Sequence, residues 1–280
     1  MTISSQKVLE LKQSVCQDID ARANDLVSIS HQLHAKPETN FEEHFAHQIL
    51  TDYIADSKVK VTRKAFDLDT AFDVRIKGGS GPTVAVLCEY DALPGIGHAC
   101  GHNIIAAAGL GAGLALAGLA EEAGGRLRLM GTPAEEGGGG KIEMARKGAF
   151  VGVDAAMMVH PADRELARMN AIAIQHCLVK YTGEAAHAAV SPHLGKNALD
   201  AAVLGYMNIA ALRQHILPTE RIHGIFLKGG EKPNIVPRET EMDWYVRSNT
   251  IETLQPLKER VAGCLHGGAH AAGCHIDLQW

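Results

Sequence analysis

Short apolar runs that alternate with helical segments constrain the fold of this sequence more than any other feature. Residues 83–88, TVAVLC, form a run that is typical of a strand buried on both faces. After this run, apolar spacing predicts strands at 126–130 and 155–159, with helices over 104–120 and 142–147. Strands that alternate with helices indicate a mostly parallel sheet covered on both faces, so the expected fold class is α/β.

The segment before this run predicts helices and then strands. Apolar residues recur at helical spacing over 5–35, and Pro37 ends the pattern because proline cannot continue a helix. A second helix is expected over 41–54, followed by strands at 59–63 and 72–76. These elements belong to the same α/β domain.

The order of the expected strands and helices changes beyond about residue 168. We therefore expect two domains, residues 1–168 and 169–280. The second has the order strand, helix, strand, strand, helix, strand, which is the split βαβ pattern of a ferredoxin-like α+β domain. Its expected elements are, in order, 171–182, 197–215, 222–227, 239–246, 251–271 and 275–279.

The composition argues against several classes of protein. Lys and Arg number 27 against 32 Asp and Glu, and a net charge of −5 without a basic stripe argues against a nucleic-acid partner. The six cysteines lack paired spacing, so we expect no disulfide framework and a cytoplasmic location. The N-terminus is polar and has no apolar signal region. Residues 104–120 are uncharged but mostly Ala and Gly, which favours a buried helix over a membrane span.

Acidic and histidine side chains follow three of the expected strands. Glu89 and Asp91 follow the first, Glu135 and Glu136 the second, and His160 the third. In parallel sheets, ligands bind beyond the carboxyl ends of the strands. The sequence therefore predicts a site where these side chains gather.

The loop GIGHACGHN, residues 95–103, adds two candidates. Its glycines make a tight loop feasible, and Asn103 is expected to cap the helix that follows. The positive end of that helix favours a thiolate at Cys100, which would make it a metal ligand beside His102. A catalytic nucleophile is the alternative role for Cys100. Thiolate, imidazole and carboxylate together suit Zn²⁺ or Mn²⁺, whereas His98 is not an expected ligand.

The adjacent acids Glu135 and Glu136 divide into two roles. One carboxylate can bind metal while the other takes a proton from water. Two solvated acids at the start of a helix are the alternative. In the second domain, His187 follows a strand and could donate a hydrogen bond to a developing oxyanion; a solvent-facing or structural histidine is the alternative there.

Four segments of the sequence carry a further signal, namely EYDALPGIGHACGHN (89–103), GTPAEEGGGGK (131–141), MVHPA (158–162) and GEAAHA (183–188). Together they resemble the aminoacylase/carboxypeptidase family of co-catalytic metallopeptidases. They are most similar to its amidohydrolase branch, which includes aminobenzoyl-glutamate hydrolases, β-alanyl dipeptidases and indole-acetyl-amino-acid hydrolases. HxLHxxPExxFEE at 31–43 fits the same branch. The resemblance implies an α/β metallopeptidase domain followed by a lid and dimerisation domain.

By position, the resemblance assigns a role to each candidate. Glu135 matches the general base, and Asp91 matches the aspartate that supports the metal site. His187 matches a lid histidine that reaches into the partner subunit's active site and polarises the scissile carbonyl. Asn234 and Arg247 match substrate-binding positions, where arginine suits a free carboxylate. The implied metal ligands are Cys100, His102, Glu136 and His160.

The implied reaction is hydrolysis of an amide between an acyl or aminoacyl group and a free amino acid. Its substrates would be N-acyl amino acids, aminobenzoyl-glutamate or dipeptides, and its cofactors two divalent ions, Zn²⁺ or Mn²⁺. A homodimer formed through the lid is implied as well. The composition adds the expectation of a cytoplasmic protein without a nucleic-acid or membrane partner.

One feature departs from the family pattern. The family inserts its lid into the catalytic domain and then returns to finish the sheet with a last histidine ligand. This sequence ends at Trp280, at the last expected strand of the lid, so we expect a catalytic domain that is incomplete at its C-terminus. The rival hypothesis is a catalytically incomplete remnant that serves as a dimerising or metal-binding module.

Overall fold

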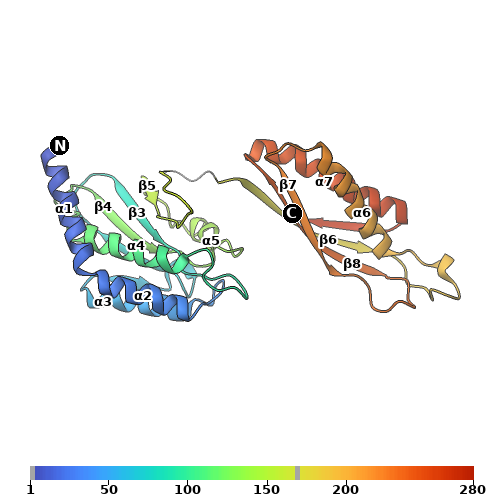
Figure 1. Cartoon of the computed structure of the whole chain (residues 1–280), viewed down its shortest axis with the longest axis horizontal. Helices are drawn as coiled ribbons and strands as arrows, with labels where there is room; N and C mark the ends of the chain where they lie inside the picture. The colour runs from blue at the N-terminus through green and yellow to red at the C-terminus, as the bar shows by residue number, and fades with distance from the viewer. Residues whose placement is uncertain (1–3, 168–170) are drawn as a thin grey trace. The chain divides into compact units, whose positions relative to one another are not determined.

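The computed structural model describes residues 4–167 and 171–280 and divides into two compact units, 1–165 and 166–280. Figure 1 shows the first unit in blue to yellow and the second in yellow to red. The boundary expected between residues 168 and 169 lies outside the described residues. Each unit has a hydrophobic core of its own.

The first unit is an α/β structure built on a mixed sheet. Within residues 4–167, the strand order is β1-β2-β4-β3-β5. Strand β3 is parallel to β4 and β5, whereas β2 is antiparallel to β1 and β4. The elements are α1 Ser5–Ala21, α2 Ala23–Ala35, α3 His44–Asp56, β1 Val61–Arg63, β2 Phe72–Ile76, β3 Thr83–Cys88, α4 His102–Ala117, β4 Arg126–Gly131, α5 Gly140–Arg146 and β5 Ala155–Met157, with a 3-10 turn at Ala65–Asp67.

The expectation of a mostly parallel sheet is wrong for part of this unit. It holds for β3, β4 and β5, because helices α4 and α5 separate them along the chain. Strands β1 and β2 are joined by residues 64–71, a connection short enough for antiparallel neighbours. Apolar patterning identifies strands but not their direction, so the sequence did not reveal that β2 runs antiparallel to β1 and β4.

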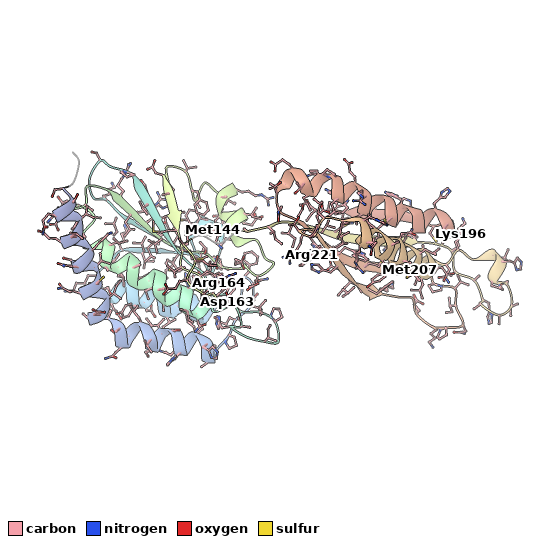
Figure 2. All side chains as sticks on the ribbon, turned by 45° about the horizontal axis from the view of Figure 1, so that its top comes forward. Met144, Asp163, Arg164, Lys196, Met207 and Arg221 are labelled. Atoms are coloured by element: carbon pink, nitrogen blue, oxygen red, sulfur yellow. The ribbon has the colours of Figure 1, made fainter. Side chains whose placement is uncertain are left out.

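Helices cover both faces of the sheet. On β3, Val86 and Cys88 face the larger core, which α2, α3 and α4 complete. Ala85 and Leu87 face the opposite side and pack with Met144 of α5, which is labelled in Figure 2. Because successive strand residues point to opposite faces, a strand covered on both sides must be apolar throughout.

The Ala- and Gly-rich helix α4 is largely buried against β3 and β4. Its small side chains allow this close packing. Among the described residues, no helix combines the length and the apolar character that crossing a membrane requires.

The second unit is an antiparallel sheet with α6 and α7 on one face (Figure 1). The strand order β7-β8-β6-β9 is that of a ferredoxin-like α+β domain. The two helices approach each other closely at Gly268. A Cβ added at this residue would lie 2.3 Å from the carbonyl oxygen of Ala201, so a larger side chain would not fit. The elements are β6 Ala173–Thr182, α6 Ala198–Leu212, β7 Arg221–Lys228, β8 Glu239–Ser248, α7 Ile251–Ala272 and β9 His275–Gln279, with 3-10 turns at Pro192–Leu194 and Arg213–His215.

Candidate metal centre

His102 lies at the centre of the candidate site. It is the first residue of α4, and Gly101 before it has a left-handed backbone with φ of 78°. A Cβ at Gly101 would lie 2.8 Å from Cγ of Pro161, so glycine is required both by the turn and by the close approach. The His102 side chain is 1% exposed, and its Nε2 has no hydrogen-bond partner among the described residues.

Carboxylates from two parallel strand ends surround this imidazole. Oδ1 of Asp91 lies 3.2 Å from Nδ1 of His102. On the other side of the ring, Nε2 lies 3.5 Å from Oε2 of Glu89. The same Nε2 lies 3.6 Å from Glu136 Oε1 and 3.9 Å from Glu135 Oε2. Since β3 and β4 are adjacent and parallel, the residues that follow them meet at one edge of the sheet.

Two groups of side chains in the described structure could each hold a cation, and both include His102. In one group its partners are Glu89 and His160, and in the other they are Glu135 and Glu136. In each group the ligand atoms lie within 4.8 Å of one another. Within residues 4–167 and 171–280, Nε2 of His102 and Oε2 of Glu89 are both buried without a hydrogen bond, an arrangement that a cation would satisfy. Imidazole and carboxylate ligands fit Zn²⁺ or Mn²⁺.

The charges of the site are strongly coupled. Burial alone would raise the pKa of Asp91, but His102 and the backbone N–H groups of Glu136 and Glu135 lower it overall. Burial disfavours the charged form of His102, yet Asp91, with Glu89 and Glu136, raises its pKa overall. Burial, followed by the charges of Glu89 and Glu136, raises the pKa of Glu135. The site therefore concentrates negative charge that a cation would balance.

Cys100 lies close to the candidate centre but belongs to neither of the two groups of potential ligands. The interaction of its thiol with the Glu136 carboxylate, followed by burial, raises the pKa of Cys100 to about 11. The role of Cys100 as a metal ligand stays a prediction, because the charge of a cation would lower this raised pKa. A raised pKa does not favour a nucleophilic role, which requires a thiolate.

Asn103 is not the cap of α4. The helix begins at His102, and Gly101 is the N-cap residue. The Asn103 amide instead donates to the hydroxyl oxygen of Ser30 at 2.9 Å and to its carbonyl oxygen at 3.3 Å. Asn103 therefore ties α4 to α2.

Glu89 follows β3 and is among the acids that the sequence expects to gather at the site, but the sequence assigns it neither a catalytic nor a metal-binding role. The side chain is 2% exposed and pairs with Lys141 of α5. Its only sequence signal was an acid directly after an apolar strand, the same signal that identified Asp91. Its proximity to His160 became visible only in the folded chain.

In the second unit, two of the candidates lie together. His187 and Asn234 are both exposed on loops, and the backbone N–H of Ala188 donates to the carbonyl oxygen of Asn234 at 3.0 Å. Lys196, labelled in Figure 2, pairs with Glu184 in the same loop region. These loops follow the C-terminal end of β6 and precede β8.

Arg247 lies near the opposite end of this sheet. It pairs in register with Ile174, whereas Thr182 ends β6 on the side of His187. The eight residue steps along the strand from Ile174 to Thr182 span about 26 Å. The structure therefore does not bring Arg247 together with His187 and Asn234.

An α/β sheet whose strand ends carry a histidine and several acids defines a candidate hydrolase with a metal centre. Residues 85–266 match Peptidase family M20/M25/M40. The chain is 40% identical over 291 residues to the Xaa-Arg dipeptidase of Mus musculus, a match covering 99% of this chain and 68% of that protein. It is 34% identical over 281 residues to one of the polypeptides of the p-aminobenzoyl-glutamate hydrolase of Escherichia coli, covering 93% and 58%. The chain belongs to peptidase family M20/M25/M40, which confirms the predicted family and enzyme class.

Solved structures support the same fold. A dinuclear metal-binding peptidase of the M20 family from Bacillus subtilis has a TM-score of 0.71 at 22% identity, covering 93% of this chain and 74% of that one. An aminobenzoyl-glutamate utilization protein from Klebsiella pneumoniae has a TM-score of 0.73 at 21% identity, covering 95% and 77%.

Proposed function

We propose that this protein is a metal-dependent amidohydrolase that cleaves the amide between an acyl or aminoacyl group and a free amino acid. One observation carries the proposal: the buried Nε2 of His102 has no hydrogen bond to any described residue and faces Glu89, Glu135 and Glu136. The names of the relatives, a Xaa-Arg dipeptidase and a p-aminobenzoyl-glutamate hydrolase, support this substrate class. They do not favour the alternative of an inactive remnant.

The proposed cofactors are two divalent ions, Zn²⁺ or Mn²⁺. His102, Glu136 and His160 are proposed ligands, with Glu89 added by its position. Cys100 is proposed as a ligand because it contacts Glu136, and the charge of a cation would lower its raised pKa. Bound divalent ions would polarise the scissile carbonyl and increase the acidity of water.

The remaining steps fall to protein side chains. Glu135 is proposed to accept a proton from the attacking water and to return it to the leaving amine. Its raised pKa brings it nearer to neutral pH, which suits a base that must also act as an acid. Asp91 accepts from Nδ1–H of His102, which fixes the tautomer and leaves Nε2 free to bind a cation.

The second unit is proposed to be a lid and dimerisation domain in a cytoplasmic homodimer. His187, supported by Asn234, would donate a hydrogen bond to the substrate carbonyl in the active site of a second copy of the chain. The exposure of both residues supports this role, because neither is committed to the core of its own unit. Since Arg247 lies about 26 Å away along the sheet, one lid does not offer Arg247 and His187 to the same small substrate. Arg247 as a carboxylate-binding residue stays a prediction.

The test is a hydrolysis assay on protein loaded with Zn²⁺ or Mn²⁺. The substrates are aminobenzoyl-glutamate, dipeptides ending in arginine, β-alanyl dipeptides and N-acyl amino acids. We expect release of the free amino acid from at least one class. Glu135→Gln should abolish turnover and leave the metal content unchanged. Turnover that survives this change would show that the base is misassigned, and inactivity on every substrate would contradict the proposed function.

A further inference from the structure

The carboxylate of Glu43 is completely buried and bonds to the residue before Glu135, yet it has no role in the proposed reaction. Glu43 is 0% exposed and lies at the start of α3. Burial of a carboxylate is unfavourable unless donors surround it, and burial indeed raises the pKa of Glu43. Its Oε2 accepts from the Thr70 hydroxyl at 2.8 Å. Its Oε1 accepts two backbone N–H groups, those of Phe41 and Ala134, both at 2.9 Å.

Both of these backbone donors are strained. Phe41 has φ of 63° and Ala134 has φ of 57°, in the left-handed region that residues with a Cβ rarely adopt. Such conformations persist only where the surrounding structure holds them. One oxygen of Glu43 binds both strained residues, so this carboxylate stabilises the two turns at once.

Ala134 immediately precedes the two acids of the active site. Its left-handed conformation therefore sets the direction in which the chain presents Glu135 and Glu136. The next backbone groups are held as well, because the N–H of Glu136 donates to Asp91 at 2.8 Å. The carbonyl oxygen of Glu136 accepts from the Asn40 amide at 2.6 Å. Residues 40–43 thus hold the acid pair from outside the metal centre.

We propose that Glu43 is a positioning residue for Glu135 and Glu136, acting by holding Ala134 in its left-handed conformation. This inference rests on the proposed function. The inference goes beyond the proposed function because it gives a role to the FEE segment at 41–43, which has no role in the proposed reaction. The hydrogen bonds of the Glu43 carboxylate go to Thr70, Phe41 and Ala134 and not to the proposed ligands or to Glu135.

The adjacent glutamate provides a matched control. Glu42 has a side chain that is 73% exposed, so Glu42→Ala changes the same residue type without touching the acid pair. We expect Glu43→Ala to lower kcat by about tenfold to a hundredfold, with little change in KM, and to weaken Zn²⁺ binding. Glu43→Gln keeps an oxygen for the two N–H groups, so its loss should be smaller.

A rescue separates positioning from general destabilisation. In the Glu43→Ala protein, Ala134→Gly should restore most of kcat and Zn²⁺ affinity, because glycine adopts positive φ without strain. If Glu43→Ala does not fold, the same comparison is made between Glu43→Gln and Glu43→Gln with Ala134→Gly. A merely structural role would lower the melting temperature and leave Ala134→Gly without effect on kcat.

Hydrogen exchange and Zn²⁺ titration make the test independent of turnover. Faster amide exchange over residues 131–140 in Glu43→Ala, but not in Glu42→Ala, supports the proposal even if the substrate is misassigned. A folded Glu43→Ala protein with unchanged exchange and unchanged Zn²⁺ affinity would overturn it. Absence of hydrolysis in the unaltered protein would contradict only the proposed function.

Discussion

The two units present their candidate functional residues in opposite ways. In the first unit, Asp91 and His102 are at most 1% exposed and hydrogen-bonded to each other, so the fold fixes their geometry. In the second unit, His187 and Asn234 lie exposed on loops. Preorganised polar groups stabilise charge without reorganising, whereas exposed groups gain this property only when another surface excludes water around them. Changes at His102 or Asp91 should therefore affect metal binding, and a change at His187 should affect turnover alone.

The largest effect is expected from His102→Ala. His102 belongs to both groups of potential ligands, so its loss should remove metal from both and abolish turnover. Metal content after dialysis and circular dichroism measure this outcome. His98→Ala is the matched control, since His98 is a buried histidine of the same loop that belongs to neither group. Full metal content in folded His102→Ala would remove the basis for the proposed centre.

The next largest effect is expected from His187→Ala. Removal of one hydrogen-bond donor to a developing oxyanion lowers kcat by about a hundredfold to a thousandfold. Because His187 is exposed, metal content and melting temperature should stay unchanged. His193→Ala, at another exposed histidine nearby in the chain, should leave kcat unaltered. Loss of metal in His187→Ala would contradict the proposal that the first unit binds the metal and the second contributes only to turnover.

A mixing experiment tests whether His187 acts in a second copy of the chain. Glu135→Gln and His187→Ala are each expected to be inactive alone. A mixed dimer would contain one site with an intact Glu135 and a partner's intact His187, so unfolding and refolding them together should recover about a quarter of normal activity. No recovery, with mixed dimers demonstrated by mass, would place His187 in its own chain's reaction or outside the reaction.

A smaller effect is expected from Asp91→Asn. The amide keeps the shape of the side chain but removes the charge that supports His102, and such outer ligand partners typically contribute about tenfold to a hundredfold to metal affinity. Zn²⁺ titration by calorimetry measures the change. An affinity equal to that of the unaltered protein would show that the Asp91–His102 contact is only structural.

The smallest effect concerns stability and is confined to the first unit. Burial, followed by the charge of Arg63, lowers the pKa of His47, so the folded state favours the neutral imidazole. The unfolded chain binds this proton below about pH 6.5, and the free energy of unfolding should therefore fall as the pH drops through that value. His47→Gln should reduce this dependence in urea denaturation. At about pH 8 the His47 imidazole is neutral in both the folded and the unfolded chain, so the difference in the free energy of unfolding between His47→Gln and the unaltered protein reports packing alone. A pH dependence that is the same in both proteins would contradict the prediction.

Much of the first unit could be predicted from local patterns. The apolar run at 83–88 is strand β3, and the acids after β3 and β4 do meet around one histidine. The direction of β2 could not be predicted, because strand pairing is decided by neighbours that are distant in the sequence. The raised pKa of Cys100 could not be predicted either. The sequence indicates that a helix follows Cys100, but it does not reveal the contact between Cys100 and Glu136.

Glu43 shows the same limit most clearly. In the sequence, Glu42 and Glu43 are two adjacent acids with nothing to distinguish them. The fold leaves one in solvent and buries the other against Ala134, which is 91 residues away along the chain. Burial and long-range hydrogen bonding gave these identical residues different roles.

The sequence by itself determined the family, the alternation of strands and helices, and the residue types available for the chemistry. These depend on local periodicity and on short motifs, which a linear chain carries in full. Only the tertiary structure decided which ligands lie within reach of His102, and which strained turns the buried carboxylate stabilises. It also separated Arg247 from His187 by the length of a strand. Each of these depends on distances between segments that are far apart in the chain.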